Sequence, residues 1–239
     1  MKKFWNFGTV KNEESGTEER VLELYGTIAD ETWFGDEVTP AMFKSELDSG
    51  SGPITVYINS PGGDCIAASQ IYTMLKEYKN TVTVKIDGLA ASAASVIAMA
   101  GDKVIMAPTS LIMIHNPSMI AMGERKDFEK AIDILNEVKE SIINAYQSKT
   151  GLSRAVISHM MDDESWMNAN KAIELKFADE ILKGTTSNIV SDSLLFSAKK
   201  VEMSLFNKIA KQEEAPTSIK TGRSVSTLKN ELIHVKKFI

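Results

Sequence analysis

Apolar residues in the middle of the chain follow two spacings, one typical of buried strands and one typical of helices. The β-branched run ITVYI at 54–58 ends in the turn-forming stretch 59–63. After it, apolar side chains recur at helical spacing at Ala67, Ile71, Met74, Leu75 and Tyr78. A second run, VTVKI at 82–86, is closed by Asp87-Gly88, and a helix of small residues is predicted from Ala90 to Ala100. Residues 54–100 therefore predict two strand–turn–helix units.

Two further short strands are predicted at 103–106 and 111–114. This order of elements predicts an α/β fold of repeated βαβ units, with a parallel sheet, covering helices and right-handed crossovers. In such sheets the working groups gather at the carboxyl ends of the strands. The glycine turn at 59–63, the serine-bearing turn after the second strand and His115 all lie at such ends.

A long amphipathic helix is predicted at 126–149. Its apolar stripe consists of Phe128, Ala131, Ile132, Leu135, Val138, Ile142 and Tyr146. At 1.5 Å per residue the helix would span roughly 36 Å, which is more than a small domain needs to cover its sheet. We expect part of it to project and to pack against another subunit, although an ordinary surface helix is the alternative.

Composition narrows the chemistry that the chain can carry. Of its 239 residues, 43% are apolar and 25% are charged, as in an ordinary globular protein. There is no apolar run long enough to cross a membrane, and the start of the chain turns polar at once, so we expect a soluble, cytoplasmic protein. One cysteine, Cys65, and three scattered histidines predict neither disulfides nor a metal site, and no cofactor is expected.

Charge divides the chain near residue 190. Residues 1–192 carry 18 basic and 28 acidic side chains, whereas residues 193–239 carry 9 basic and 4 acidic ones. We therefore predict an N-terminal segment at 1–19, a catalytic domain at 20–187 and a basic tail at 188–239. The tail contains an amphipathic stretch at 194–209 and a terminal helix or strand at 225–239.

The basic tail could bind nucleic acid. However, the tail has no aromatic stacking platform and no cluster of more than two basic residues. Docking on the acidic body of the chain, or on a partner protein, is therefore the favoured interpretation.

Ser92 and His115 are the candidate nucleophile and base. A serine hydroxyl becomes a nucleophile when a base takes its proton and N–H donors receive the oxyanion. Ser92 follows a strand and a glycine and lies among alanines, while His115 follows the apolar strand LIMI and could exchange the proton. The backbone amides of Gly63 and Ala93 are the candidate oxyanion donors.

Each of these features has a structural alternative. A stretch such as AASAAS is more often a close helix contact, a PGG sequence is more often a turn, and a lone histidine is usually structural. Three such features at the carboxyl ends of neighbouring predicted strands are hard to explain by packing alone. Their combination therefore favours a catalytic site.

The three stretches 58–63, 88–92 and 113–117 resemble the signature blocks of the Clp protease proteolytic subunit family. They read Ile-Asn-Ser-Pro-Gly-Gly, Gly-Leu-Ala-Ala-Ser and Met-Ile-His-Asn-Pro. The resemblance covers roughly residues 20–185, with the long helix corresponding to the family's handle and 172–179 to its closing helix. It implies a serine endopeptidase of the crotonase-like fold that acts on proteins or peptides. It also implies a homo-oligomeric ring, a heptamer or a double ring.

The family's third triad member is an aspartate two residues before an aromatic residue. Here the corresponding segment contains Asp162-Asp163-Glu164-Ser165-Trp166. Ungapped counting from His115 places Glu164 in that position, with Asp163 beside it, and either carboxylate could orient the imidazole. The alternative for this acidic run is a solvated helix cap.

The Glu-Ser-Trp variant, Asp64 after the glycine pair, the short segment before the first signature block and the basic tail resemble Clp-related proteases of tailed phages and prophages. That resemblance implies processing of capsid or scaffold proteins. The sequence itself gives no sign of loops that would dock an ATPase partner. The alternatives are ATPase-partnered general protein degradation, a ring-forming assembly protein with a vestigial site, and hydratase or isomerase chemistry on acyl-CoA, which would need a catalytic carboxylate.

Overall fold

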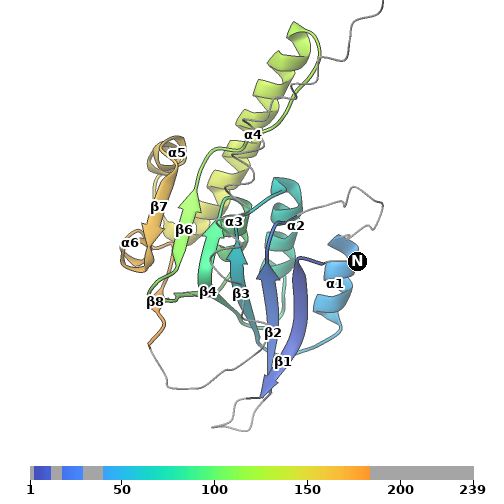
Figure 1. Cartoon of the computed structure of the whole chain (residues 1–239), viewed down its shortest axis with the longest axis vertical. Coiled ribbons are helices and arrows are strands. Elements are labelled where there is room, and N and C mark those ends of the chain that lie inside the picture. The colour runs from blue at the N-terminus through green and yellow to red at the C-terminus, as the bar shows by residue number, and fades with distance from the viewer. Residues whose placement is uncertain (1–2, 12–17, 29–39, 184–239) are drawn as a thin grey trace, which may run out of the picture. The chain divides into compact units, whose positions relative to one another are not determined.

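The structure is a computed structural model that describes residues 3–11, 18–28 and 40–183. Its elements in chain order are β1 (Trp5–Lys11), β2 (Glu18–Tyr25), α1 (Pro40–Asp48), β3 (Ile54–Ser60), α2 (Cys65–Lys76), β4 (Val82–Ala91), α3 (Ala93–Ala98), β5 (Lys103–Met106), β6 (Leu111–Ile114), α4 (Arg125–Thr150), α5 (Arg154–Asp162), β7 (Ser165–Asn168), α6 (Ala169–Glu174) and β8 (Glu180–Ile181). The α/β fold is therefore as predicted (Figure 1). The elements predicted in the basic tail lie outside the described residues.

The sheet has the strand order β1-β2-β3-β4-β5-β8, and β6 and β7 branch from β4. Strands β2, β3, β4 and β5 are parallel neighbours, whereas the β1–β2 and β6–β7 pairs are antiparallel. The prediction of a parallel sheet was thus incomplete. For β1 and β2 the reason is the short connection at 12–17, because a parallel pair needs a crossover of a dozen or more residues.

Strand β4 is longer than its hydrophobic pattern predicts. It continues through Asp87-Gly88 to Ala91, so the small-residue helix that was predicted from Ala90 begins only at Ala93. The first half of β4 pairs with β5 and the second half with β6. Backbone pairing with this second partner outweighs the turn-forming tendency of an Asp-Gly pair. The extension brings the end of β4 beside the end of β6.

One face of the sheet forms the core. On β3 and β4 the side chains on this face are at most 1% exposed: Ile54, Val56, Ile58, Val82, Val84 and Ile86. Helices α2 and α3 add five further buried aliphatic or methionine side chains, Ile71, Met74, Leu75, Val96 and Ile97. These apolar side chains lie two residues apart on each strand, which fixes the register, because a slip of one residue would turn this set to the other face.

Helix α4 was predicted at 126–149 and spans Arg125–Thr150. Its buried side chains gather in its carboxyl-terminal part, where Ile143 and Tyr146 join the core, and Ala131 is the one buried residue toward the other end. The helix ends at Gly151, whose left-handed backbone (φ 70°) closes it. Its amino-terminal part extends well past the sheet in Figure 1. A projecting handle is therefore present.

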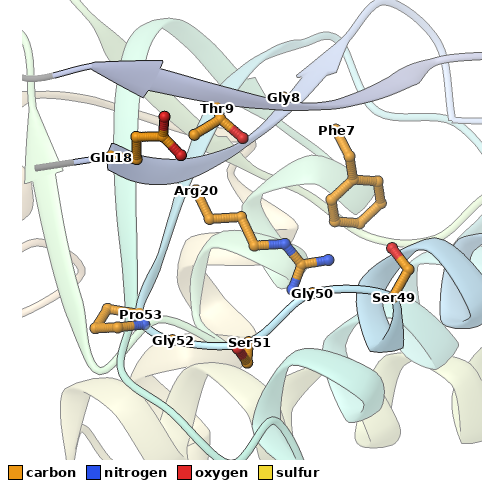
Figure 2. Close-up of a pocket in the computed structure, with 10 residues that line it drawn as sticks. All are labelled: Phe7, Gly8, Thr9, Glu18, Arg20, Ser49, Gly50, Ser51, Gly52 and Pro53. Carbon is orange, nitrogen blue, oxygen red and sulfur yellow. The ribbon is translucent and has the colours of Figure 1, made fainter.

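A pocket lies at the amino-terminal ends of β2 and β3 (Figure 2). Ser92 and His115 follow the carboxyl ends of β4 and β6, which run parallel to these strands, so the pocket is at the other end of the sheet from them. Arg20 lines it and is already engaged: its guanidinium donates to the carbonyl oxygen of Glu46 at 2.6 Å and to the Tyr78 hydroxyl at 3.0 Å. The guanidinium also lies 5.3 Å from the ring centroid of Phe7. These contacts tie β2 to neighbouring elements and give Arg20 a structural role.

Candidate active site

Ser92 lies in the tight turn between β4 and α3, with φ 55° and ψ −127°. Such a conformation is rare for a residue with a side chain, and backbone strain of this kind clusters at functional sites. Ser92 is the N-cap of α3, rather than part of its first turn as the sequence suggested. Its N–H donates to the carbonyl oxygen of Met113 on β6 at 2.9 Å. That bond fixes the serine beside the strand that carries the candidate base.

The structure brings Ser92 and His115 together. The Nε2 atom of His115 lies 2.7 Å from the Oγ atom of Ser92, within hydrogen-bond distance. The two residues directly follow β4 and β6, which pair in parallel up to the register Ala91↔Met113. This pairing explains why two side chains 23 residues apart in the sequence share one edge of the sheet.

The glycine turn packs directly against Ser92. Gly62 has φ 93°, and a Cβ added there would lie 2.7 Å from the Ser92 Cβ. Gly63 has φ 150°, and a Cβ there would lie 1.9 Å from the carbonyl oxygen of Ile28, which shares a parallel bridge with Gly63. Both positions therefore require glycine. The sequence pointed to Gly63 as a functional residue and to Gly62 only as part of the turn.

Two backbone N–H groups in this region remain available. Within the part of the chain that the structure describes, no hydrogen bond is donated by the amide of Gly63 or by that of Ala93. Ala93 is the first residue of α3, where amides lack a partner within the helix. Both amides adjoin the Ser92 turn, where an oxyanion would form if this hydroxyl attacked a carbonyl carbon.

The three acidic residues at 162–164 have different contacts. Asp162 accepts hydrogen bonds from Asn116 Nδ2 at 2.8 Å and from Lys139 Nζ at 2.6 Å. The bond to Lys139 above all, and then that to Asn116, lower the pKa of the Asp162 carboxyl. Asp163 is the C-cap of α5, and its N–H donates to the carbonyl oxygen of His159, so the helix-cap interpretation holds for its backbone. Sequence reasoning missed the link from Asp162 to Asn116, the residue that follows His115.

Glu164 lies one step beyond the β6–β7 ladder. The ladder ends with Ile114 opposite Ser165, and His115 and Glu164 are the residues that follow this last pair on the two sides. Glu164 has φ 47°, a second strained non-glycine position near the serine. In the described part of the chain, no hydrogen bond reaches the other ring nitrogen of His115, and the Glu164 carboxylate accepts one from the Trp166 indole. The serine and the imidazole are thus brought together, and the candidate acid lies at the adjoining position.

Tyr25, the last residue of β2, and Asp87 on β4 form a half-buried pair. The Tyr25 hydroxyl donates to Asp87 Oδ2 at 2.6 Å and links β2 to β4. Burial, as the largest cause, raises the pKa of the Asp87 carboxyl. The hydrogen bond joins β2 to β4, which leads to Ser92, and so spans β3, which leads to the glycine turn.

Ser95 differs from Ser92 in being fully buried. Its Oγ donates to the carbonyl oxygen of Ser92 at 2.6 Å and lies 2.7 Å from the hydroxyl of Tyr146 on α4. The sequence AASAAS thus contains one serine at the site and one that holds α3 against the handle helix.

We expect Ser95→Ala to destabilise the fold without removing the nucleophile. The buried Tyr146 hydroxyl would lose its partner, which lowers the free energy of unfolding by about 1–3 kcal/mol. Urea unfolding measures this loss, and labelling of Ser92 by a fluorophosphonate probe should persist. The matched control is Ser95→Ala combined with Tyr146→Phe, which removes both hydroxyls and should cost less than the two single changes added. Loss of labelling in folded Ser95→Ala would contradict this assignment.

Two further findings concern the described residues only. No group of three or more His, Cys, Asp or Glu side chains among them could hold a metal ion. None of the helices in these ranges has the length and apolar character needed to cross a membrane.

Comparison with known proteins identifies the family. The Clp protease family model matches residues 11–185. The ATP-dependent Clp protease proteolytic subunit 1 of Chlamydia muridarum is 35% identical over 150 residues, which cover 61% of this chain and 78% of that protein. Its namesake from Protochlamydia amoebophila is 30% identical over 150 residues, covering 61% and 73%. A ClpP1 mutant from Listeria monocytogenes matches in structure with a TM-score of 0.58 and 28% identity, over 68% of this chain and 90% of that one. With the sheet and helix arrangement described above, these matches show that the chain belongs to the Clp protease family and is a serine endopeptidase with the ClpP fold.

Proposed function

We propose that Ser92, His115 and Glu164 form the catalytic triad of this endopeptidase, with the amides of Gly63 and Ala93 as its oxyanion hole. The observation that carries the proposal is the 2.7 Å separation of Ser92 Oγ and His115 Nε2 at a strained turn. Neither side chain needs to move for the proton transfer that makes the serine nucleophilic.

The proposed reaction proceeds in two halves. Ser92 Oγ attacks the carbonyl carbon of the scissile bond while His115 takes the hydroxyl proton, and the oxyanion receives the two amide N–H groups. The C–N bond then breaks, and His115 returns the proton to the leaving amine. A water molecule, activated by the same imidazole, hydrolyses the acyl-enzyme and restores the serine.

A fluorophosphonate probe tests the nucleophile directly. We expect the wild-type chain to be labelled at Ser92, which peptide mass spectrometry would locate, and Ser92→Ala to remain unlabelled. Ser95→Ala is the control for probe access. A folded wild-type chain that is not labelled would contradict the proposal and favour a vestigial site.

We also propose that the handle helix builds a homo-oligomeric ring, a heptamer or a double ring. Support comes from apolar side chains exposed along the handle and the loop before it: Ile120 is 93% exposed, Met122 89%, Ile132 58% and Phe128 48%. Contiguous exposed apolar surface of this kind marks a contact with another protein.

Charge on this surface should therefore dissociate the assembly. We expect Phe128→Glu combined with Ile132→Glu to reduce the sedimentation coefficient, because carboxylates in a subunit contact would be buried without partners. Ser141→Glu, an exposed position on another face of α4, is the control and should leave the particle unchanged. A wild-type chain that sediments as a folded monomer would remove the ring from the proposal.

For the biological substrate, we propose capsid or scaffold proteins of a phage or prophage, cleaved in the cytoplasm. The support is the Glu164-Ser165-Trp166 variant and the basic character of residues 193–239. Coexpression with the neighbouring genes, with intact Ser92 or with Ser92→Ala, tests this by mass spectrometry of new protein termini. Cleavage that requires ATP and an ATPase partner would instead favour general protein degradation.

A further inference from the structure

Trp166 lies beside the proposed triad in a way that the peptidase mechanism alone does not explain. Its indole Nε1 donates a hydrogen bond to Glu164 Oε1 at 3.1 Å. Trp166 is 51% exposed, so its ring is not held in place by the core. Among the described residues its indole is the side-chain donor to this carboxylate, and it lies two residues further along the chain.

The end of the β6–β7 ladder brings these residues into one region. Glu164 directly precedes β7, and the hydrogen bond between the two side chains places its carboxylate beside the Trp166 indole. The ladder pairs Met113 with Trp166 and ends with Ile114 opposite Ser165, and His115 and Glu164 are the next residue on each side. The indole and the carboxylate therefore lie at the end of the ladder that His115 directly follows.

A glutamate at this position needs more support than a shorter acid. Its side chain has three rotatable bonds before the carboxylate, and holding such a chain in one geometry costs conformational entropy. Glu164 is exposed, and its φ of 47° places it outside the regular strand. A donor that fixes one carboxylate oxygen restricts the side chain to fewer conformations. It thereby lowers the entropy cost of a hydrogen bond between the other oxygen and the imidazole.

We propose that Trp166 is a positioning residue: its indole N–H holds one oxygen of the Glu164 carboxylate so that the other is presented to the free ring nitrogen of His115. The inference rests on the proposed triad and adds to it the group that orients the acid. Catalytic hydrogen bonds are often long or poorly aligned in the free enzyme and tighten when substrate binds, so we assign the short His115–Glu164 bond to the substrate complex and a longer contact to the free enzyme.

The decisive variant is Trp166→Phe, which keeps an aromatic ring and deletes only the N–H donor. With a fluorogenic peptide selected from a library by the wild-type chain, we expect kcat to fall about tenfold. Trp166→Phe combined with Glu164→Gln should be no slower than Glu164→Gln alone, because the indole acts only through that carboxylate. Thermal unfolding of each variant checks that the fold is kept.

The chain offers a matched control at the far edge of its sheet. Trp5 Nε1 donates to Glu46 Oε2 at 3.0 Å, which is the same kind of bond between β1 and α1. Trp5→Phe deletes that donor and should leave the kinetics unchanged. The pH profile of kcat/KM gives a second readout, since a less well-held carboxylate stabilises the imidazolium less and moves the acidic limb to lower pH in Trp166→Phe and Glu164→Gln.

Three kinetic outcomes would overturn the inference. Equal rates for Trp166→Phe and wild type would show that the indole N–H does not contribute to orienting the carboxylate. A faster variant would show that the indole holds the carboxylate away from His115. Multiplication of the two single losses in the double variant would show that Trp166 acts independently of Glu164.

Nitrogen NMR of the His115 ring separates this inference from the proposed function. The share of neutral rings that carry their proton on Nδ1 should shift to a lower value in Trp166→Phe and in Glu164→Gln, because the oriented carboxylate favours that tautomer, whether or not any peptide is cleaved. A chain with these shifts but no peptidase activity would contradict the proposed function and leave the positioning role standing. A chain that cleaves peptide but shows no shift would contradict the positioning role alone.

Discussion

Ser92→Ala and His115→Ala should each lower peptidase turnover by at least about 10⁴-fold, and the double variant should be little worse than either single one. The reason is the shared proton: the hydroxyl is a poor nucleophile without the imidazole, and the imidazole has nothing to activate without the hydroxyl. Their 2.7 Å contact is the reason to expect that they act as one unit. Initial rates on a fluorogenic peptide, at protein concentrations high enough to detect residual cleavage, measure the loss.

His159 supplies the control for the histidine change. It lies on α5 near the carboxyl end of that helix, and its ring is not among the contacts of Ser92. We expect His159→Ala to keep turnover within a few-fold of wild type. If His115→Ala retained most of its activity while folded, another group would have to be the base, and the assignment of His115 would be wrong.

The strands and helices near the site were largely predictable because their signals are local. The β-branched runs at 54–58 and 82–86 and the apolar stripe of the long helix each depend on spacing within one segment. The extension of β4 to Ala91 was not predictable in this way, because it depends on β6, a partner that lies some 20 residues further along the chain. Antiparallel pairing of β7 with β6 is likewise a property of the tertiary fold.

The same distinction applies to the site. His115 directly follows a predicted strand, and Gly63 and Ser92 lie in the turns after two others, so their common location at the carboxyl ends of the strands could be inferred from the order of elements. The requirement for glycine at position 62 depends on contact with the Ser92 side chain, which no local pattern encodes. The separation of the three acidic residues at 162–164 also depends on tertiary contacts, above all those of Asp162.

The structure favours Glu164 over Asp163 as the candidate triad acid and so predicts which of two variants loses turnover. Asp163 is the C-cap of α5, whereas Glu164 directly adjoins the last pair of the β6–β7 ladder, at the end that His115 also follows. We expect Glu164→Gln to lower kcat by at least roughly 10²-fold, since loss of the orienting carboxylate in a related triad costs about 10⁴-fold. The change keeps the side chain's shape and deletes its charge, so the comparison isolates the carboxylate.

Asp163→Asn is the matched control, because it removes an adjacent negative charge from the same acidic run. We expect its turnover at saturating peptide to stay within a few-fold of wild type, since a single carboxylate can occupy the position next to the free nitrogen of His115. The reverse result, a large loss in Asp163→Asn and a small one in Glu164→Gln, would exchange the roles of the two residues. Near-normal turnover in both would mean that Ser92 and His115 work as a dyad, and Trp166 would then have no carboxylate to position.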